Sequence, residues 1–582
     1  MLEMVAVGVA LFALVAAAGV FGPRIGVADP LLLVMVGLLI SLIPVVPDFV
    51  VEPDLVLEVL LPPLLYAAAV SLPPMSMRRE FTAISGLSVV LVIFTAVALG
   101  LVFAWLIPGV GFAWGAALGA IISPTDAAAT AIVKKAGVPS RAIVILEGEA
   151  LLNDATALVL LRTAVASALG TFSVWAAVGT FAYSVAVAAA IGGIVGVVTL
   201  WVRARIEEPT IATIVSFTVP FLASIPAELL DAPGLVAAVV AGLVTSLRGA
   251  GRLPPLHRLS DRQNWASVQR LLEGLVFVTM GLQLPTVIED VATGDFGVSI
   301  ALAVSMLALV IALGVRAAYV LPLLWQLQRR VRLGQARAES LDRMKDKVDA
   351  AGESGEPLVL TQEDRSVPVR PSPARPGGRR EEEGPRTPPW TQRREERRRT
   401  RSRTLGGEEI ARFGRRIRRA IADLDYFMRQ PLGRREGLVV VWAGMRGAVT
   451  VATAQTLPTA QTLPTETPHR PLLVFIAFAV ATISLLGQGL TVGPLAARLY
   501  RDDPDEPDSE QRVAERQQVA EVLRTAVDAH AGEEAVDVIK AQRAALLRAR
   551  SELAVDGEVL DTALRRLDAS QIEWEIRRGK AV

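Results

Sequence analysis

Two short segments place polar and ionisable residues inside runs that are otherwise long and apolar. Residues 123–126 read Ser-Pro-Thr-Asp near the middle of one run, and Asn153-Asp154 lie at the middle of the next. Ionisable groups at the centre of a bilayer are costly and usually serve ion or proton pathways. Proline removes a backbone donor and clashes with the preceding helical turn, so a helix break is predicted at Pro124. The two segments therefore predict one polar site at mid-membrane depth.

Asp154 is predicted to bind the transported species. Burial favours the neutral, protonated carboxyl group, so a proton can compete there with a metal cation. A hard cation such as sodium prefers oxygen ligands, and the expected ones are the Asp154 carboxylate, the Thr125 hydroxyl and carbonyls freed by the helix break. Asp154 is neutral with either sodium or a proton bound, whereas the bare anion crosses the membrane only at high cost. The prediction is therefore exchange of sodium for protons. One titrating group predicts electroneutral exchange, although Asp126 leaves a second titrating group open.

Further charges near the same depth are predicted to support the site. Glu149 and Arg316 occur at matching depths in two of the apolar runs and are predicted to form an ion pair. Residues 444–447 read Gly-Met-Arg-Gly at the centre of another run, where the paired glycines permit a second helix break. Broken helices leave partial charges at their ends, which Asp126 can offset at the positive ends and Arg446 at the negative ends.

The elements that must position these residues are long apolar helices. The chain has 582 residues, of which 52% are hydrophobic, and a bilayer-spanning helix needs about 20 apolar residues. The sequence predicts an all-α polytopic membrane protein with thirteen transmembrane helices. The predicted spans are 4–21, 31–46, 55–72, 84–107, 112–135, 141–168, 174–201, 210–227, 232–248, 266–288, 299–325, 438–457 and 471–496.

Loop charges predict the orientation of these spans. Lys and Arg occur in alternate loops, as at Arg78, Arg79, Arg203 and Arg205, which places the N-terminus outside and the C-terminus in the cytoplasm of a multi-pass cell-membrane protein. Spans 1–6 and 8–13 then form two inverted six-helix repeats, with the seventh span as connector. The fifth and twelfth spans correspond to each other. Both are interrupted at mid-membrane, as expected of crossed discontinuous helices at an ion site.

The chain divides by composition into four predicted regions. They are 1–325 with spans 1–11, a cytoplasmic insertion at 326–437, 438–496 with spans 12 and 13, and a helical cytoplasmic tail at 497–582. The middle of the insertion, 351–407, is rich in Pro, Gly, Arg and Glu and is predicted to be disordered. Residues 408–428 interleave an apolar stripe with arginines, which predicts a helix on the inner membrane surface. The tail is predicted to form two or three helices, separated near Gly532 and Gly557.

The composition excludes several classes of function. The chain has no cysteine, so disulfides, thiolate catalysis and Cys-ligated metals are excluded. Its three histidines argue against a His-based metal site, and its net charge of +1 argues against a nucleic-acid partner. No nucleophile–base constellation is present, so an enzyme is not predicted, and no cofactor is expected.

These motifs resemble those of the monovalent cation:proton antiporter family, which includes bacterial sodium/proton antiporters and animal sodium/proton exchangers. The resemblance covers most of residues 1–500 and rests on LPPLLYAAA (61–69), SPTDAAAT (123–130), EGEALLNDATALV (147–159), FVTMGLQLP (277–285) and WAGMRGAVTVATA (442–454). It implies a thirteen-helix fold with a dimer domain and a core ion-transport domain, a homodimer in the lipid bilayer, and a role in pH homeostasis. It also implies that Asn153 and Asp154 form the site, with Thr125 and Asp126 at the crossing.

Two departures from the family pattern keep alternatives open. Some members have a glutamate where this chain has Ala67 and a serine ligand where it has Ala150. Both changes remove oxygen ligands and leave the choice of cation open. The alternatives are a potassium/proton antiporter and a membrane sensor of the same fold that has lost transport.

Overall fold

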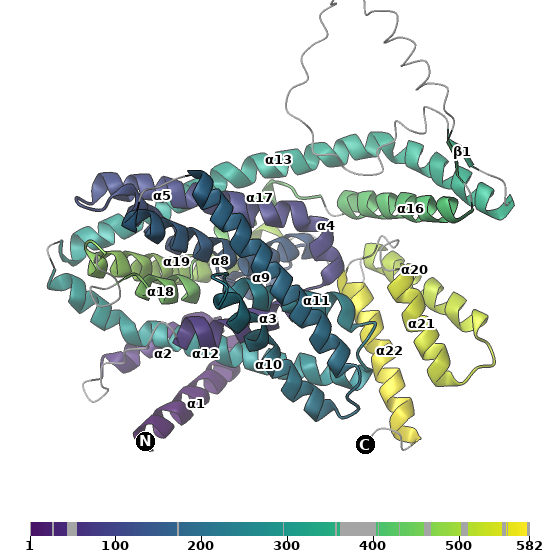
Figure 1. Cartoon of the computed structure of the whole chain (residues 1–582), viewed down its shortest axis with the longest axis horizontal. Coiled ribbons are helices and arrows are strands. Elements are labelled where there is room, and N and C mark those ends of the chain that lie inside the picture. The colour runs from purple at the N-terminus through teal and green to yellow at the C-terminus, as the bar shows by residue number, and fades with distance from the viewer. Residues whose placement is uncertain are drawn as a thin grey trace, which may run out of the picture.

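The computed structural model is a bundle of helices, and Figure 1 shows its arrangement. The residues that it describes are 2–25, 28–43, 55–170, 174–294, 296–354, 358–360, 403–405, 407–429, 431–458, 467–501, 510–549, 555 and 557–578.

The first half of the described chain is helical with short connections. Its elements are α1 (Leu2–Ile25), α2 (Asp29–Ser41), the π-helical η1 (Leu55–Leu60), α3 (Leu61–Ser71), α4 (Pro74–Ser85), the π-helical η2 (Gly86–Leu91), α5 (Val92–Leu106), α6 (Phe112–Ile122), α7 (Ala128–Lys135) and α8 (Ser140–Leu169). The second half adds α9 (Val174–Arg203), α10 (Pro209–Glu228), α11 (Gly234–Gly249), α12 (Pro255–Ala292), α13 (Gly297–Ser354), α16 (Gly407–Arg429), α17 (Arg434–Trp442), α18 (Ala448–Gln455) and α19 (Arg470–Leu499). The tail contributes α20 (Glu510–Ala529), α21 (Ala535–Ala549) and α22 (Gly557–Arg577).

Each predicted span coincides with one helix or with consecutive helical segments. Within the described residues, six helices are long and apolar enough to cross a membrane. Five shorter apolar helices, α1, α2, α6, α11 and the η1–α3 unit, lie at other predicted spans. The multi-pass helical architecture is therefore supported, whereas the count of thirteen spans and the inverted repeats stay predictions.

Large apolar side chains on the outside of the bundle indicate contact with lipid. Trp105 is 83% exposed, Leu101 60% and Ile194 64%. A water-soluble surface rarely exposes contiguous apolar area of this kind. These side chains are therefore expected to face the lipid of the bilayer.

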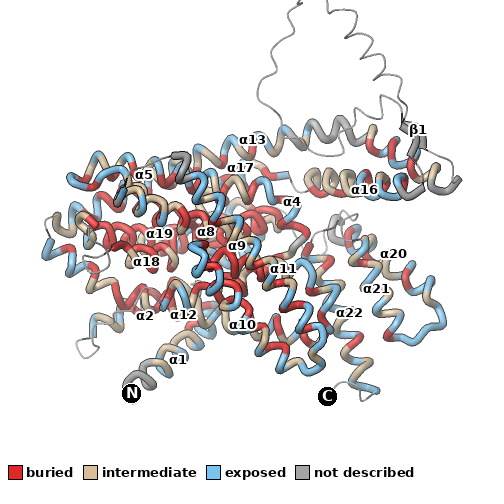
Figure 2. The backbone as a smooth tube through the Cα atoms, in the orientation of Figure 1, coloured by how far each residue is buried: buried red, intermediate tan, exposed pale blue. Residues whose placement is uncertain are grey.

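α19 lies in the interior of the bundle. In its apolar window, 83% of the residues are buried inside the protein, and Figure 2 shows buried residues concentrated along α8, α18 and α19. A second, smaller core joins α3, α9, α10, α11 and α12. There the rings of Tyr66 and Trp265 lie 4.8 Å apart between centroids. α19 is thus placed to support whatever lies at the centre of the larger core.

The insertion helix α16 packs on a long extension of α13. α13 continues past the predicted span end at residue 325 because the residues that follow are mainly strong helix formers. Met344 and Val348 of this extension form a core with Ile410 and Ile417 of α16, and Figure 1 shows the two helices side by side.

This packing corrects the prediction of a helix on the membrane surface. The apolar stripe that was expected to enter lipid is instead buried against α13. The predicted disorder of 351–407 falls largely outside the described residues. Within that range, 351–354 belong to α13, and β1 (Leu358–Leu360) pairs antiparallel with β2 (Arg403–Leu405).

The tail helices dock on the membrane helices α4 and α12. Met75 of α4 lies in the hydrophobic core of the tail. Arg258 of α12 pairs with Asp568 of α22, and Arg262 pairs with Asp561 at 2.5 Å. These contacts place the tail on the same side of the bundle as the loops around residues 75 and 258. That this side is cytoplasmic stays a prediction.

Candidate functional site

Two helices break at the centre of the larger core and meet there. α6 ends at Ile122 and α7 begins at Ala128, on either side of the predicted break. α17 ends at Trp442 and α18 begins at Ala448, on either side of the Gly-Met-Arg-Gly motif. The backbone N–H of Asp126 donates to the Met445 carbonyl at 2.7 Å. This bond joins the two unwound segments into one crossing.

Asp126 binds the positive ends of both short half-helices. Its Oδ1 accepts the backbone N–H of Ala128 at 2.7 Å, and its Oδ2 accepts that of Ala448 at 3.2 Å. A carboxylate is favoured at a helix N-terminus because the first N–H groups there lack partners within the helix. One side chain therefore caps α7 and α18 together.

Arg446 binds the negative ends that face them. Its Nε donates to the carbonyl of Ile122, the last residue of α6, at 3.1 Å, and its Nη1 donates to the Gly444 carbonyl beyond α17. The guanidinium is fully buried, with 1% exposure. Asp126 and Arg446 thus lie at the helix ends where the sequence placed them, with opposite signs at opposite ends.

The two glycines of the Gly-Met-Arg-Gly motif leave space for charged side chains. A Cβ at Gly447 would overlap the Asp126 carboxylate, and a Cβ at Gly444 would overlap the Arg316 guanidinium. The motif therefore does more than permit a break, since its glycines let an acid and a base approach the backbone of the crossing.

We expect Gly447→Ala to disrupt the crossing. The added methyl group must displace Asp126 from the N-termini of α7 and α18, and overpacking of this kind costs about 1–3 kcal/mol. Gly193→Ala on α9 is the matched control, because a Cβ there has nothing within 4 Å. Thermal unfolding in detergent should show a lower midpoint for Gly447→Ala alone. Equal midpoints for the two variants would contradict the close approach of Asp126.

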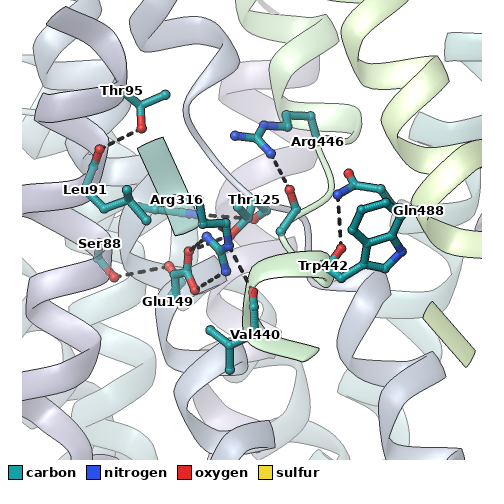
Figure 3. Close-up of polar contacts among 12 residues, drawn as sticks. Ser88, Leu91, Thr95, Thr125, Glu149, Arg316, Val440, Trp442, Arg446 and Gln488 are labelled. Atoms are coloured by element: carbon teal, nitrogen blue, oxygen red, sulfur yellow. Dashed lines mark hydrogen bonds and ion pairs between the residues drawn. The ribbon is translucent and has the colours of Figure 1, made fainter. Parts of the chain in front are cut away.

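Asn153 and Glu149 connect α8 to the crossing through Thr125. Figure 3 shows Thr125 beside Glu149. The Asn153 Nδ2 donates to the Thr125 Oγ1 at 2.8 Å and to the Thr125 carbonyl at 3.3 Å. The Thr125 hydroxyl in turn donates to Glu149 Oε1 at 3.2 Å. The Thr125 hydroxyl thus accepts one hydrogen bond and donates another, which leaves one of its lone pairs for a further ligand.

Glu149 and Arg316 form the ion pair that the sequence predicts. The Arg316 Nη2 donates to Glu149 Oε2 at 2.9 Å, and Nη1 donates to Oε1. Arg316 Nε also donates to the carbonyl of Val440, two residues before the end of α17, at 3.0 Å. Both side chains are at most 2% exposed. A buried pair with this many hydrogen bonds is compensated in charge and in hydrogen bonding.

Asp154 differs from the other charged groups at the crossing. It is 5% exposed, and among the described residues it has neither a hydrogen-bond donor nor a cation beside it, only the repulsive charge of Asp126. The other charged residues of the crossing carry no net charge, because Asp126 and Glu149 are balanced by Arg316 and Arg446. Ionised Asp154 would therefore be an uncompensated buried anion, which is strongly unfavourable unless it binds a proton or a cation.

The residue before Asp154 also carries an oxygen without a partner. The Asn153 Oδ1 is buried without a hydrogen-bond partner in the described structure. Its orientation is fixed because the Thr125 carbonyl can only accept, so the Asn153 amide nitrogen must face it. Ala67 and Ala150, which replace oxygen-bearing residues of the family pattern, are both buried and contribute no side-chain oxygen. The described residues contain no cluster of three or more His, Cys, Asp or Glu side chains for a resident metal.

Two residues of α19 that the sequence analysis did not select also reach the crossing. Ser484 accepts the backbone N–H of Arg446, and Gln488 donates to the Trp442 carbonyl. The signal that could have found them is their spacing of four residues, which puts two polar side chains on one face of an apolar helix.

Comparison with known proteins identifies the family. Residues 9–338 and 417–498, together more than half of the chain, match the profile of the family described as sodium/hydrogen exchanger, transmembrane. An uncharacterized Na(+)/H(+) exchanger of Escherichia coli is 36% identical over 250 residues, which are 41% of this chain and 45% of that protein. A sodium, potassium, lithium and rubidium/H(+) antiporter of Bacillus subtilis is 30% identical over 280 residues, which are 45% of this chain and 40% of that protein. The chain thus spans about half the length of the relatives it matches.

A solved structure shares the fold. The sodium proton antiporter MjNhaP1 from Methanocaldococcus jannaschii aligns with a TM-score of 0.55 and 14% identity, over 86% of this chain and 99% of that chain. The family profile confirms the resemblance that the sequence motifs indicated. The chain belongs to the sodium/hydrogen exchanger family of membrane proteins, whose members are cation/proton antiporters rather than enzymes.

Proposed function

We propose that this protein exchanges sodium for protons across the cell membrane, and that both ions compete for Asp154. The observation that carries the proposal is the charge balance of the crossing. Asp126 and Arg446 bind helix ends, and Glu149 binds Arg316. Asp154 alone among these groups lacks a compensating partner within the described residues, so a proton or a cation must supply one.

The ligands proposed for the cation are oxygens that the crossing leaves free. They are the Asp154 carboxylate, the unpartnered Asn153 Oδ1 and the remaining lone pair of the Thr125 hydroxyl. Hard monovalent cations prefer such oxygen ligands. The absence of side-chain oxygen at Ala67 and Ala150 makes this set small, so backbone carbonyls or water must complete it.

The different bonding of the two aspartates supports the proposal that exchange is electroneutral. Asp126 accepts two backbone N–H bonds, which stabilise its charged form at both half-helix ends. Asp154 has no such stabilisation and is left as the titrating group. One proton then leaves for each cation that binds, and the neutral loaded forms are those that cross. The same proposal has the protein as a multi-pass homodimer in the lipid bilayer, with its C-terminus in the cytoplasm.

Potassium/proton exchange is the second candidate. It is favoured by the Bacillus relatives, whose name covers sodium, potassium, lithium and rubidium. The two candidates are distinguished by dequenching of a pH-sensitive dye in everted vesicles on addition of each chloride salt. Dequenching by sodium at lower concentration than by potassium supports the first. The reverse order would replace sodium by potassium, and no response to any cation at any pH would contradict both.

The middle of the insertion is expected to be dispensable for exchange. Residues 361–402, outside the described residues, have a composition that cannot build a packed core. Their deletion should leave dye dequenching unchanged. A matched deletion of α16 should instead lower expression, because it exposes Met344 and Val348. A folded but inactive 361–402 deletion would show that this segment belongs to the transport machinery.

A further inference from the structure

Ser484 and Gln488 of α19 bind the two sides of the α17–α18 break. The Ser484 Oγ accepts the Arg446 backbone N–H at 2.9 Å and donates to Gln488 Oε1 at 2.6 Å. The Gln488 Nε2 donates to the Trp442 carbonyl at 3.1 Å, and Figure 3 shows this last contact beside Arg446. The three bonds form one chain from Arg446 through α19 to Trp442.

This chain takes the place of a missing helical hydrogen bond. In a continuous α-helix the N–H of residue 446 would donate to the carbonyl of residue 442, four positions earlier. The break separates those two groups, and buried backbone groups are costly when they lack a partner. The two side chains from α19 satisfy both groups without letting the helix close.

The direction of the chain is fixed by its ends. The Trp442 carbonyl can only accept, so it requires the Gln488 amide nitrogen, and Oε1 is left for the Ser484 hydroxyl. Ser484 is 0% exposed and Gln488 is 3% exposed, so water has little access to replace either.

We infer that Ser484 and Gln488 are positioning residues that hold the α17–α18 break open in the geometry the ion site requires. The bond from Ser484 fixes the backbone of Arg446, whose side chain binds the end of α6, and the adjoining Met445 carbonyl accepts the Asp126 N–H. The effect on cation binding therefore passes through the crossing, since neither residue bonds to Asp154. This effect on exchange rests on the proposed function, whereas the bracing itself does not.

The test combines Ser484→Ala, Gln488→Leu and the double variant. Thr482→Val is the matched control, because its hydroxyl is a buried α19 group without a partner. Hydrogen exchange of peptides covering 443–448 is expected to rise about tenfold in each variant, since one unmade buried hydrogen bond weakens protection by about that order. The double variant should match the single ones, because all three break one chain. The control should match the wild type.

The transport readout separates positioning from packing. Loss of the hydrogen-bond chain through Ser484 and Gln488 is expected to raise the KM for sodium about tenfold. The amount of folded protein should change little, since the affected bonds position the crossing. Gln488→Glu adds a pH signature. Its charged carboxylate can only accept, whereas its protonated carboxyl both donates and accepts. Its activity relative to wild type should therefore recover as the pH falls, whereas that of Gln488→Leu should not.

Gln488→Asn is the second variant in case Gln488→Leu does not fold, because its amide is too short to span both partners. Unchanged hydrogen exchange at 443–448 in Ser484→Ala and in the folded Gln488 variant would contradict the claim that these two side chains hold the break open. Faster hydrogen exchange at 443–448 with an unchanged KM for sodium would show that the hydrogen-bond chain braces the break but does not position the ion site. If wild-type protein transports no cation, the proposed function fails, and the hydrogen-exchange result still decides the brace.

Discussion

Asp154→Asn is expected to abolish cation/proton exchange while the protein remains folded and inserted. Asparagine keeps the shape of the side chain but can neither release a proton nor offer a negative charge to a cation. The residue has no hydrogen bond or ion pair to lose within the described structure, so its replacement should not lower stability. Removing a buried charge without a partner should even raise the unfolding midpoint.

Exchange by this variant is measured in proteoliposomes loaded with a pH-sensitive dye. Asp290→Asn provides the control, because it makes the same chemical change at an exposed position at the end of α12. The control should exchange at the wild-type rate. Exchange by Asp154→Asn at a rate near that of the control would rule out this carboxylate as the group that both ions share.

Breaking the Glu149–Arg316 pair is expected to give the largest loss of stability. Either single substitution to alanine leaves an unpaired charge in the core, and breaking a buried pair costs about 3–5 kcal/mol. Arg316→Ala would also remove the donor to the Val440 carbonyl, and Glu149→Ala would remove the acceptor of the Thr125 hydroxyl. The double variant should regain part of the loss because no unpaired charge remains.

The matched control is the exposed pair of Lys540 and Asp537 on α21, which lies at 3.1 Å with side chains 58% and 52% exposed. Exposed pairs contribute about 0–1 kcal/mol, so the same substitutions there should change little. Both cycles are read from unfolding midpoints in detergent. Strictly additive losses at Glu149 and Arg316 would mean that the two side chains do not stabilise each other.

Features set by position along a helix could be predicted from the sequence. Counting residues from the ends of each apolar run put Glu149 and Arg316 at one depth, and the structure shows their ion pair. Pro124 and the glycines at 444 and 447 predicted the breaks because their effect on the backbone is local. The opposite signs of Asp126 and Arg446 followed from the helix dipole.

Features set by which helices meet could not be predicted in the same way. The apolar stripe of α16 fits either lipid or another helix, and only its packing on Met344 and Val348 decides between them. Ser484 and Gln488 look like ordinary polar residues of a membrane helix until α19 is placed against the break. The orphaned Asn153 Oδ1 likewise depends on the contact between α8 and Thr125.

The central claim is that a proton and a cation share Asp154, and proton release on cation binding tests it most directly. Purified protein in weakly buffered detergent solution receives sodium chloride, and the change in pH is followed with an indicator dye. Choline chloride corrects for ionic strength. The account predicts release of about one proton per chain from the wild type, because the carboxyl group must ionise to bind the cation, and none from Asp154→Asn. Equal proton release from both proteins would contradict the account, since the displaced proton would then come from another group.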